Sequence, residues 1–215
     1  GIHGTSYAAI AAVMKLRKEI NPEKLKGNLI LIPVLNMDSF YSRSDDTHPI
    51  DKKDLNRCFP GNAAGTITEV IADFITTKIF DATDVFLEVH SSGENRTALP
   101  FIGYYDNKEY IGQTRLSSNL CESSGFSAII KYQYGQQSGQ PAIYPFKQAV
   151  RLGIPSFSMH LGNSARGKKT FHTSARTALY NIMGELGMYE LKKRTATITK
   201  KDRYSHQSYV LSPAK

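Results

Sequence analysis

The sequence lacks the long apolar run that a membrane-spanning helix requires. Its longest continuous apolar run, "LILIPVL" at residues 29–35, is only as long as a strand, whereas a bilayer span takes about 20 residues. The first residues also lack the basic start and long apolar core of a secretory signal peptide. We therefore expect no membrane partner and a cytoplasmic location. Because the chain begins inside a motif, we also expect an upstream segment to be missing.

Cysteine is scarce. The 215 residues contain only Cys58 and Cys121, too few for the disulfide framework that stabilises small secreted domains. A disulfide between these two residues stays open as an alternative, but two separate thiols are the better interpretation. Two free thiols agree with a reducing compartment.

The chain also lacks the motifs of nucleic-acid-binding proteins, with no RNA-type aromatic motif, zinc finger or helix-turn-helix pattern. A net charge of +8 could favour such a function. However, residues 189–215 hold seven basic and two acidic residues, so +5 of this charge lies in that segment. A basic end is typical of a solvated, mobile tail. We expect no nucleic acid partner, and a basic nucleic-acid-binding module is kept only as a minor alternative.

What the sequence does contain is an alternation of helical and strand patterns. Thr66 and Glu69 have the spacing of a capping box at one helix start. The alternation predicts an α/β fold whose mixed, mostly parallel sheet is flanked by helices. Helical patterns occupy residues 5–19, 66–80, 108–123, 143–153 and 170–188, and strand patterns occupy residues 29–35, 84–90, 101–105, 127–134 and 154–161.

The two ends of the chain differ in pattern. Its length favours one large α/β domain, which we place at residues 1–190. Residues 191–215 instead include "TATITKKDRYSHQSYVLSPAK", where polar and apolar residues alternate. This segment is predicted to be a linker and the start of a small, incomplete C-terminal β unit.

Polar side chains occur near the ends of the predicted strands. His90 ends one strand, Asn36 follows another, and His160 lies one residue before the end of a third, while His3 precedes the first helix. Ligands of α/β sheets bind beyond the carboxyl ends of the strands. A single histidine is more often structural than functional, but four segments that deliver polar groups to one rim favour a functional site.

Five segments carry a more specific signal: "GIHGTSYAAI", "LILIPVLNMDSF", "DLNRCFPG", "EVHSSGENRTALPFIGYYD" and "GIPSFSMHLG". Their order and spacing resemble the zinc carboxypeptidase superfamily, and most closely its succinylglutamate desuccinylase/aspartoacylase branch. The resemblance covers residues 1 to about 190. It implies a zinc-carboxypeptidase-like fold. The segment that ends "YVLSPAK" is similar to the linker into the C-terminal β domain of that branch.

The resemblance implies a hydrolase that cleaves an amide in a small molecule or peptide bearing a free carboxylate. In the family, two histidines and a glutamate bind Zn²⁺, which activates water and polarises the scissile carbonyl. A second glutamate acts as the base. His3 and His90 match the zinc-binding histidines, and Arg43 resembles the arginine that polarises the carbonyl. The substrate-binding candidates are Asn56, Arg57, Arg96 and Tyr144.

Three positions depart from the family pattern. Ser6 stands where the family has its zinc-binding glutamate, Glu88 replaces the aspartate of the D-x-H motif, and His160 replaces the catalytic glutamate. A neutral serine hydroxyl is a poor substitute for a carboxylate ligand. His160 is either a third nitrogen ligand, which would give a three-histidine site, or a base in the position of the glutamate.

We therefore expect a zinc-dependent hydrolase of an N-acyl amino acid or peptide, with an altered site. The alternative is a catalytically silent relative that keeps the fold and a carboxylate-binding cleft. Loss of both the anionic ligand and the base favours this alternative more than either change alone. Metal content separates the two hypotheses.

Overall fold

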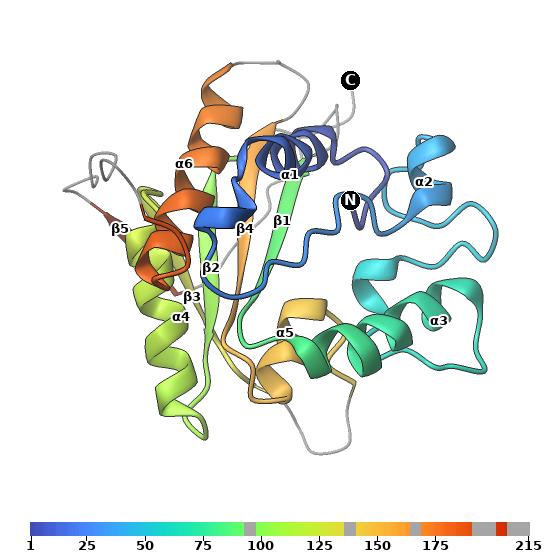
Figure 1. Cartoon of the computed structure of the whole chain (residues 1–215). Helices are drawn as coiled ribbons and strands as arrows, with labels where there is room; N and C mark the ends of the chain where they lie inside the picture. Colours follow the sequence, from blue (N-terminus) through green and yellow to red (C-terminus); the bar gives the residue numbers. More distant parts are fainter. Residues whose placement is uncertain (93–97, 136–140, 164–168, 191–200, 206–215) are drawn as a thin grey trace, which may run out of the picture.

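The computed structural model describes residues 1–92, 98–135, 141–163, 169–190 and 201–205. Its centre is one sheet with the strand order β1-β4-β2-β3-β5 (Figure 1). β1 pairs in parallel with β4, and β3 pairs in parallel with β2 and β5, whereas β2 and β4 are antiparallel. The predicted mixed, mostly parallel sheet is therefore confirmed. The strands are β1 (Phe86–Ser92), β2 (Phe101–Asp106), β3 (Ala128–Gln133), β4 (Ser156–Asn163) and β5 (Asp202–Tyr204).

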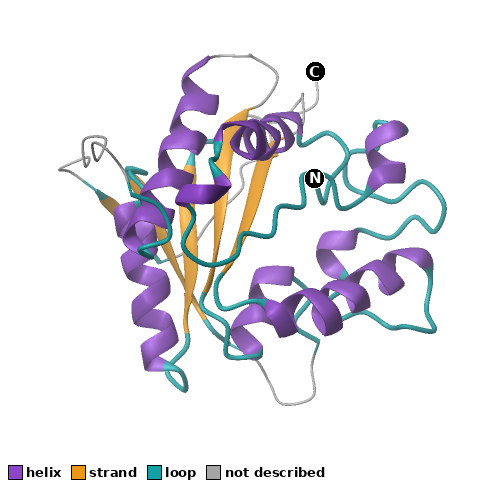
Figure 2. Cartoon of the chain, in the orientation of Figure 1, coloured by secondary structure: helices purple, strands orange, loops and turns teal. Residues whose placement is uncertain are grey.

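Helices flank this sheet on both sides (Figure 2). They are α1 (Tyr7–Glu19), α2 (Met37–Tyr41), α3 (Ile67–Phe74), α4 (Ile111–Ser123), α5 (Pro145–Arg151) and α6 (Lys169–Glu185). The predicted capping box of α3 is present, since the Thr66 backbone N–H donates to Glu69 Oε2 at 2.8 Å. The predicted helix 66–80 continues beyond α3 as a π turn (Ile75–Ile79). None of the helices in the described ranges has both the length and the hydrophobicity of a membrane span.

The two faces of the sheet differ in chemistry because successive strand residues point to opposite sides. One face carries apolar side chains such as Val89, Ile102 and Met159, which pack with α1, α4 and α6 in the larger core. The alternate residues of β1 and β4 include Glu88, His90, Ser158 and His160. One face thus forms the larger core, whereas the other carries these polar side chains and also packs against α5.

The predicted strand at residues 29–35 is wrong. These residues run past the sheet without pairing to any strand of the described chain. Leu29 and Leu31 pack against the larger core, whereas Ile30 and Ile32 are 50% and 39% exposed. The segment is therefore held by side-chain packing and by the hydrogen bond from the Leu35 backbone N–H to the Gly1 oxygen, and it has no neighbouring strand among the described residues.

The strand pattern near the C-terminus is found in part. Within residues 191–215, the described residues are 201–205, and β5 pairs in parallel with β3. β5 therefore extends the main sheet at its edge. The domain boundary at residue 190 stays a prediction.

The long polar loop between α2 and α3 is fixed by a buried hydrogen-bonded group. Asp51 accepts hydrogen bonds from the Thr68 backbone N–H at 2.9 Å and from Thr68 Oγ1 at 2.7 Å. His48 is fully buried, with its Nε2 3.3 Å from Asp38 Oδ2. Burial raises the pKa of Asp51, but the hydrogen bonds from Thr68 outweigh it and hold that pKa well below its usual range.

Replacing Asp51 with asparagine is expected to lower the free energy of unfolding at pH 7 by about 2 kcal/mol, because a charged acceptor of two hydrogen bonds is lost. A depressed carboxyl pKa stabilises the fold above the unfolded-state pKa, so this contribution should fade as the pH falls below about 4. Urea unfolding at pH 7 and pH 3 measures both effects. Asp84→Asn, at an exposed position, is the control, and equal losses in the two variants would contradict the assignment.

Candidate functional site

His3 is held in a tight turn before α1. Gly4 follows it, and a Cβ atom at Gly4 would lie 2.1 Å from the backbone oxygen of Ser39. The turn is therefore packed directly against the backbone of α2, which only a residue without a side chain allows. This packing fixes His3 relative to the loop that follows α2.

His3 and His90 each face a carboxylate. The His3 Nε2 lies 3.1 Å from Asp54 Oδ1, and the His90 Nε2 is hydrogen-bonded to Glu88 Oε1. The centroids of the two imidazole rings are 6.0 Å apart. Metal-binding histidines almost always donate their second ring nitrogen to a carboxylate or carbonyl, which fixes the tautomer and the ring orientation. Both rings have this arrangement, and no hydrogen bond within the described part of the chain engages either Nδ1.

Asp54 joins His3 to the next candidates. It precedes the 3₁₀ turn Leu55–Arg57 and accepts a hydrogen bond from the Asn56 backbone N–H at 2.9 Å. Burial raises the pKa of the Asp54 carboxyl. The hydrogen bond from His3 and the charges of His3 and Arg57 lower it by a larger amount, so the net pKa lies below the usual value. Asp54 is therefore an anion that can orient His3.

Arg57 and Tyr144 meet above this turn. Arg57 Nη1 donates to the Tyr144 hydroxyl at 3.0 Å, and its guanidinium lies 5.5 Å from the centre of the Tyr144 ring. Arg57 Nε lies 3.2 Å from Asp54 Oδ2. The structure thus places three of the predicted site residues together, since Asn56 is part of the same turn. The Asn56 Oδ1 atom is buried and has no hydrogen-bond partner among the residues that the structure describes.

His160 lies beside His90. The two residues are register partners on the parallel strands β4 and β1, and their rings stack with centroids 4.8 Å apart and planes 12° apart. The ring of Phe101 stacks on His160 at 4.2 Å. Burial, followed by the charges of His90 and His3, lowers the pKa of His160 well below its usual value. The ring is therefore neutral near pH 7.

Ser6 is buried, and its hydroxyl donates to the backbone oxygen of Ser91 at 3.3 Å. The family's carboxylate is thus absent, and the hydroxyl is engaged by the end of β1. Across the described ranges, no three histidine, cysteine, aspartate or glutamate side chains form a ready metal site. His3 and His90 fit two ligands of a zinc ion, but a catalytic zinc normally has three protein ligands.

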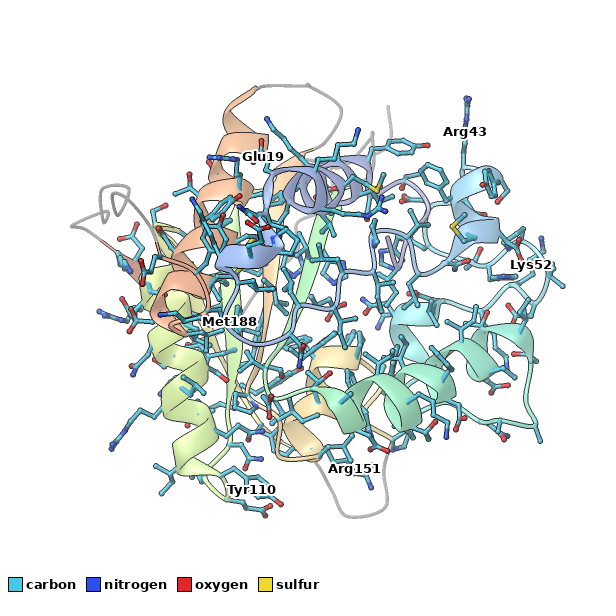
Figure 3. All side chains as sticks on the ribbon, viewed as in Figure 1. Glu19, Arg43, Lys52, Tyr110, Arg151 and Met188 are labelled. Carbon is cyan, nitrogen blue, oxygen red and sulfur yellow. The ribbon has the colours of Figure 1, made fainter. Side chains whose placement is uncertain are left out.

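Two predicted site residues are not placed beside the histidines and Arg57. Arg43 is exposed, has a φ of 54°, and points outward from the end of α2 (Figure 3). Arg96 lies outside the described residues.

Sequence reasoning missed Asp54 as a partner of His3. The signal was present, because Asp54 opens the "DLNRCFPG" segment and aspartate is a preferred cap of a helical turn. It also missed Phe101, which has no sequence motif to connect it with His160.

The catalytic-domain model of the succinylglutamate desuccinylase/aspartoacylase family matches residues 1–187. The chain is also similar to the N-alpha-acetyl-L-2,4-diaminobutyric acid deacetylase of Halomonas elongata. The two are 37% identical over 101 residues, which cover 47% of this chain and 29% of the deacetylase.

Solved structures share the fold. A succinylglutamate desuccinylase from Silicibacter sp. TM1040 has a TM-score of 0.85 at 21% identity and covers 99% of this chain. A succinylglutamate desuccinylase/aspartoacylase from Rhodobacter sphaeroides has a TM-score of 0.82 at 23% identity and covers 94%. The chain spans 63% and 59% of those two structures. The match to the family model, supported by this shared fold, shows that the chain belongs to the succinylglutamate desuccinylase/aspartoacylase family.

Proposed function

We propose that this chain is a zinc-dependent hydrolase that removes the acyl group from an N-acyl amino acid. The observation that carries the proposal is the pair of carboxylate-oriented histidines, His3 with Asp54 and His90 with Glu88. Orientation of both rings is typical of histidines that bind a metal ion. When bound, Zn²⁺ would polarise the scissile carbonyl and make a water molecule acidic.

His3 and His90 would hold the metal through the ring nitrogens that face away from their carboxylates. Asp54 and Glu88 would keep each imidazole in the correct tautomer and raise its basicity. The remaining chemistry falls to groups that bind and orient the substrate. Tyr144 and Asp54 position Arg57 for that task through the contacts described above.

Arg57 and Asn56 are the proposed contacts of the substrate carboxylate. The guanidinium is planar and permanently charged, so it can bind a carboxylate through two parallel hydrogen bonds. The unpartnered Oδ1 of Asn56 accepts a hydrogen bond, which suits the amide N–H of an acylated amino acid. Arg96, which lies outside the described residues, stays a further candidate for a contact with the substrate.

The proposed substrate is a small acylated amino acid because relatives carry such names. The Halomonas protein is a deacetylase of an N-acetylated diamino acid, and the structural relatives include desuccinylases. A peptide with a free carboxylate is the broader form of the same proposal.

A silent, carboxylate-binding relative is the second candidate, favoured by Ser6 and His160 in the places of two glutamates. Metal analysis and turnover decide between the two. Protein purified without chelator is expected to contain about one zinc ion per chain and to release amino acid from N-acetyl or N-succinyl substrates. A chain without metal that binds these compounds without cleaving them would support the silent alternative.

Replacing Arg57 with lysine is expected to raise KM for an N-acyl amino acid about tenfold with a smaller change in kcat, since a bidentate, charge-assisted contact is worth about 1.5–3 kcal/mol. Steady-state kinetics measure the change, and calorimetric Kd values replace KM if turnover is absent. Arg17→Lys on the exposed side of α1 is the control. Equal values for the wild type and Arg57→Lys would remove Arg57 from the site.

A further inference from the structure

The backbone just before α5 contains a turn that its sequence disfavours. Ile143 has a φ of 75°, and the Tyr144 N–H donates to the Ala142 oxygen, two residues earlier, at 3.0 Å. A positive φ at the centre of so short a hydrogen-bonded turn marks the rarer, strained form of the γ-turn. A β-branched residue at positive φ is an outlier in its own right. The fold therefore holds Ile143 in a conformation that its side chain opposes.

Two hydrogen bonds to a second loop hold this turn in place. The Ile143 N–H donates to the Phe59 oxygen at 2.9 Å, and the Phe59 N–H donates to the Ile143 oxygen at 3.1 Å. Phe59 is 1% exposed and packs in a second, smaller core with Ala72 of α3 and Ala149 of α5. Strained conformations persist only where the surrounding contacts determine them, and they concentrate at functional sites.

The two loops that meet here carry proposed substrate contacts. Arg57 lies two residues before Phe59, and Tyr144 directly follows Ile143. Tyr144 is also the N-cap of α5, where its backbone oxygen accepts a hydrogen bond from the Gln148 N–H at 2.9 Å. The γ-turn thus fixes the backbone N–H of Tyr144, and α5 fixes its oxygen. Because both groups are fixed, the Tyr144 side chain is directed toward Arg57 before any ligand arrives.

We propose that Ile143 is a positioning residue, whose positive-φ conformation directs Tyr144 onto Arg57 and so orients the guanidinium for a substrate carboxylate. The inference rests on the proposed function for the identity of the ligand, whereas the direction of Tyr144 is a property of the unbound chain. At the common negative φ, the peptide groups on both sides of Ile143 would rotate and break the hydrogen bonds with Phe59. An arginine oriented in advance loses less side-chain freedom on binding, which favours affinity.

Ile143→Pro tests the conformation, because proline fixes φ near −65° and has no N–H to donate to Phe59. We expect its Kd for N-acetyl and N-succinyl amino acids to rise about tenfold, since a hydrogen bond to a charged group is worth at least about this factor. Glycine accepts a positive φ without strain, so Ile143→Gly should bind at least about five times more tightly than Ile143→Pro. Calorimetry measures the Kd values. Equal affinities of Ile143→Pro and the wild type would overturn the proposal.

A stability measurement tests the strain itself. Ile143→Gly should melt at a temperature no lower than the wild type, because relief of the backbone strain offsets the lost side-chain contacts. Ile32→Gly is the matched control. Ile32 is 39% exposed, as Ile143 is, but has no positive φ, so glycine there should lower Tm by about 2–4 °C. Equal losses of Tm in the two variants would contradict the strain and therefore the proposal.

A third readout needs no substrate. The Tyr144 ring lies 5.5 Å from the Arg57 guanidinium, so the NMR signal of the Arg57 Nε–H should shift in Tyr144→Leu. Ile143→Pro should shift it likewise, and the double variant should shift it little further, since the two substitutions act through one contact. An unchanged signal in Ile143→Pro would overturn the proposal. If the signal shifts but the wild type binds none of the acylated amino acids, the proposed function fails and the positioning role of Ile143 stands.

Discussion

Ser6→Glu is expected to make the stability of this fold depend on zinc. Ser6 is 1% exposed, so a glutamate there would place a carboxylate in a buried position. An uncompensated buried charge costs about 3–5 kcal/mol. Without metal, we therefore expect the free energy of unfolding to fall by about 3 kcal/mol or more.

Zinc should reverse this loss because the new carboxylate completes the ligand set of the family. A ligand present at 1,000 times its Kd stabilises the folded state by about 4 kcal/mol. Urea unfolding in EDTA and in excess Zn²⁺ measures the difference. Ser6→Gln has the same length without the charge, and its stability should depend much less on zinc. If the glutamate and glutamine variants behave alike in both conditions, position 6 does not face the metal site.

The double variant Ser6→Glu with His160→Glu extends this result to catalysis. It restores both glutamates of the family and should gain amidase activity, since a positioned general base contributes about 10²–10⁴-fold. Zinc binding without any gain in activity would locate the remaining defect elsewhere in the chain.

Gly4→Ala is expected to destabilise the fold by about 3 kcal/mol, because overpacking typically costs about 1–3 kcal/mol and the contacts at Gly4 are with backbone atoms, which puts it at the upper end of this range. The new Cβ atom would meet the Ser39 oxygen at 2.1 Å, the Ser39 carbonyl carbon at 2.4 Å and the Ser44 oxygen at 2.5 Å. All three are backbone atoms, so no side-chain rotation relieves the contact. The α2 segment or the His3 turn must shift.

The same substitution at Gly112 is the matched control. A Cβ atom at Gly112, in the first turn of α4, would meet no atom within 4 Å, so alanine should raise stability by up to about 1 kcal/mol. Thermal unfolding measures both variants, and zinc affinity shows whether His3 moves with the turn. Equal stabilities of the two variants would contradict the close contact at Gly4.

The sequence was informative where the signal is local. The capping box at Thr66 and Glu69 follows from residues three apart, and the confirmed helices follow from their apolar period. The strand predicted at residues 29–35 failed because a strand also needs a neighbour, and apolar content alone does not supply one. A local pattern of apolar residues thus predicts a helix well, but it does not predict whether an apolar segment pairs with a neighbouring strand.

The candidate site depends on contacts that no local pattern contains. Asp54 meets His3 across 51 residues of chain, and His160 meets His90 only because β1 and β4 pair in one particular register. The family resemblance located His3, His90 and the Glu88 carboxylate, but it did not show that Asp54 meets His3 or that the rings of His90 and His160 stack. These contacts depend on strand register and loop packing, and both are visible only in the three-dimensional structure.

The division of the sheet into an apolar and a polar face has an evolutionary consequence. Val89 and Met159 contribute to the core, while their neighbours His90 and His160 project from the other side of the same strands. A substitution at the alternate positions therefore changes the chemistry of the molecule without opening a cavity beneath α1, α4 and α6. Such a scaffold can acquire, exchange or abandon a metal ligand while its architecture persists, so the reaction and the fold can diverge at different rates.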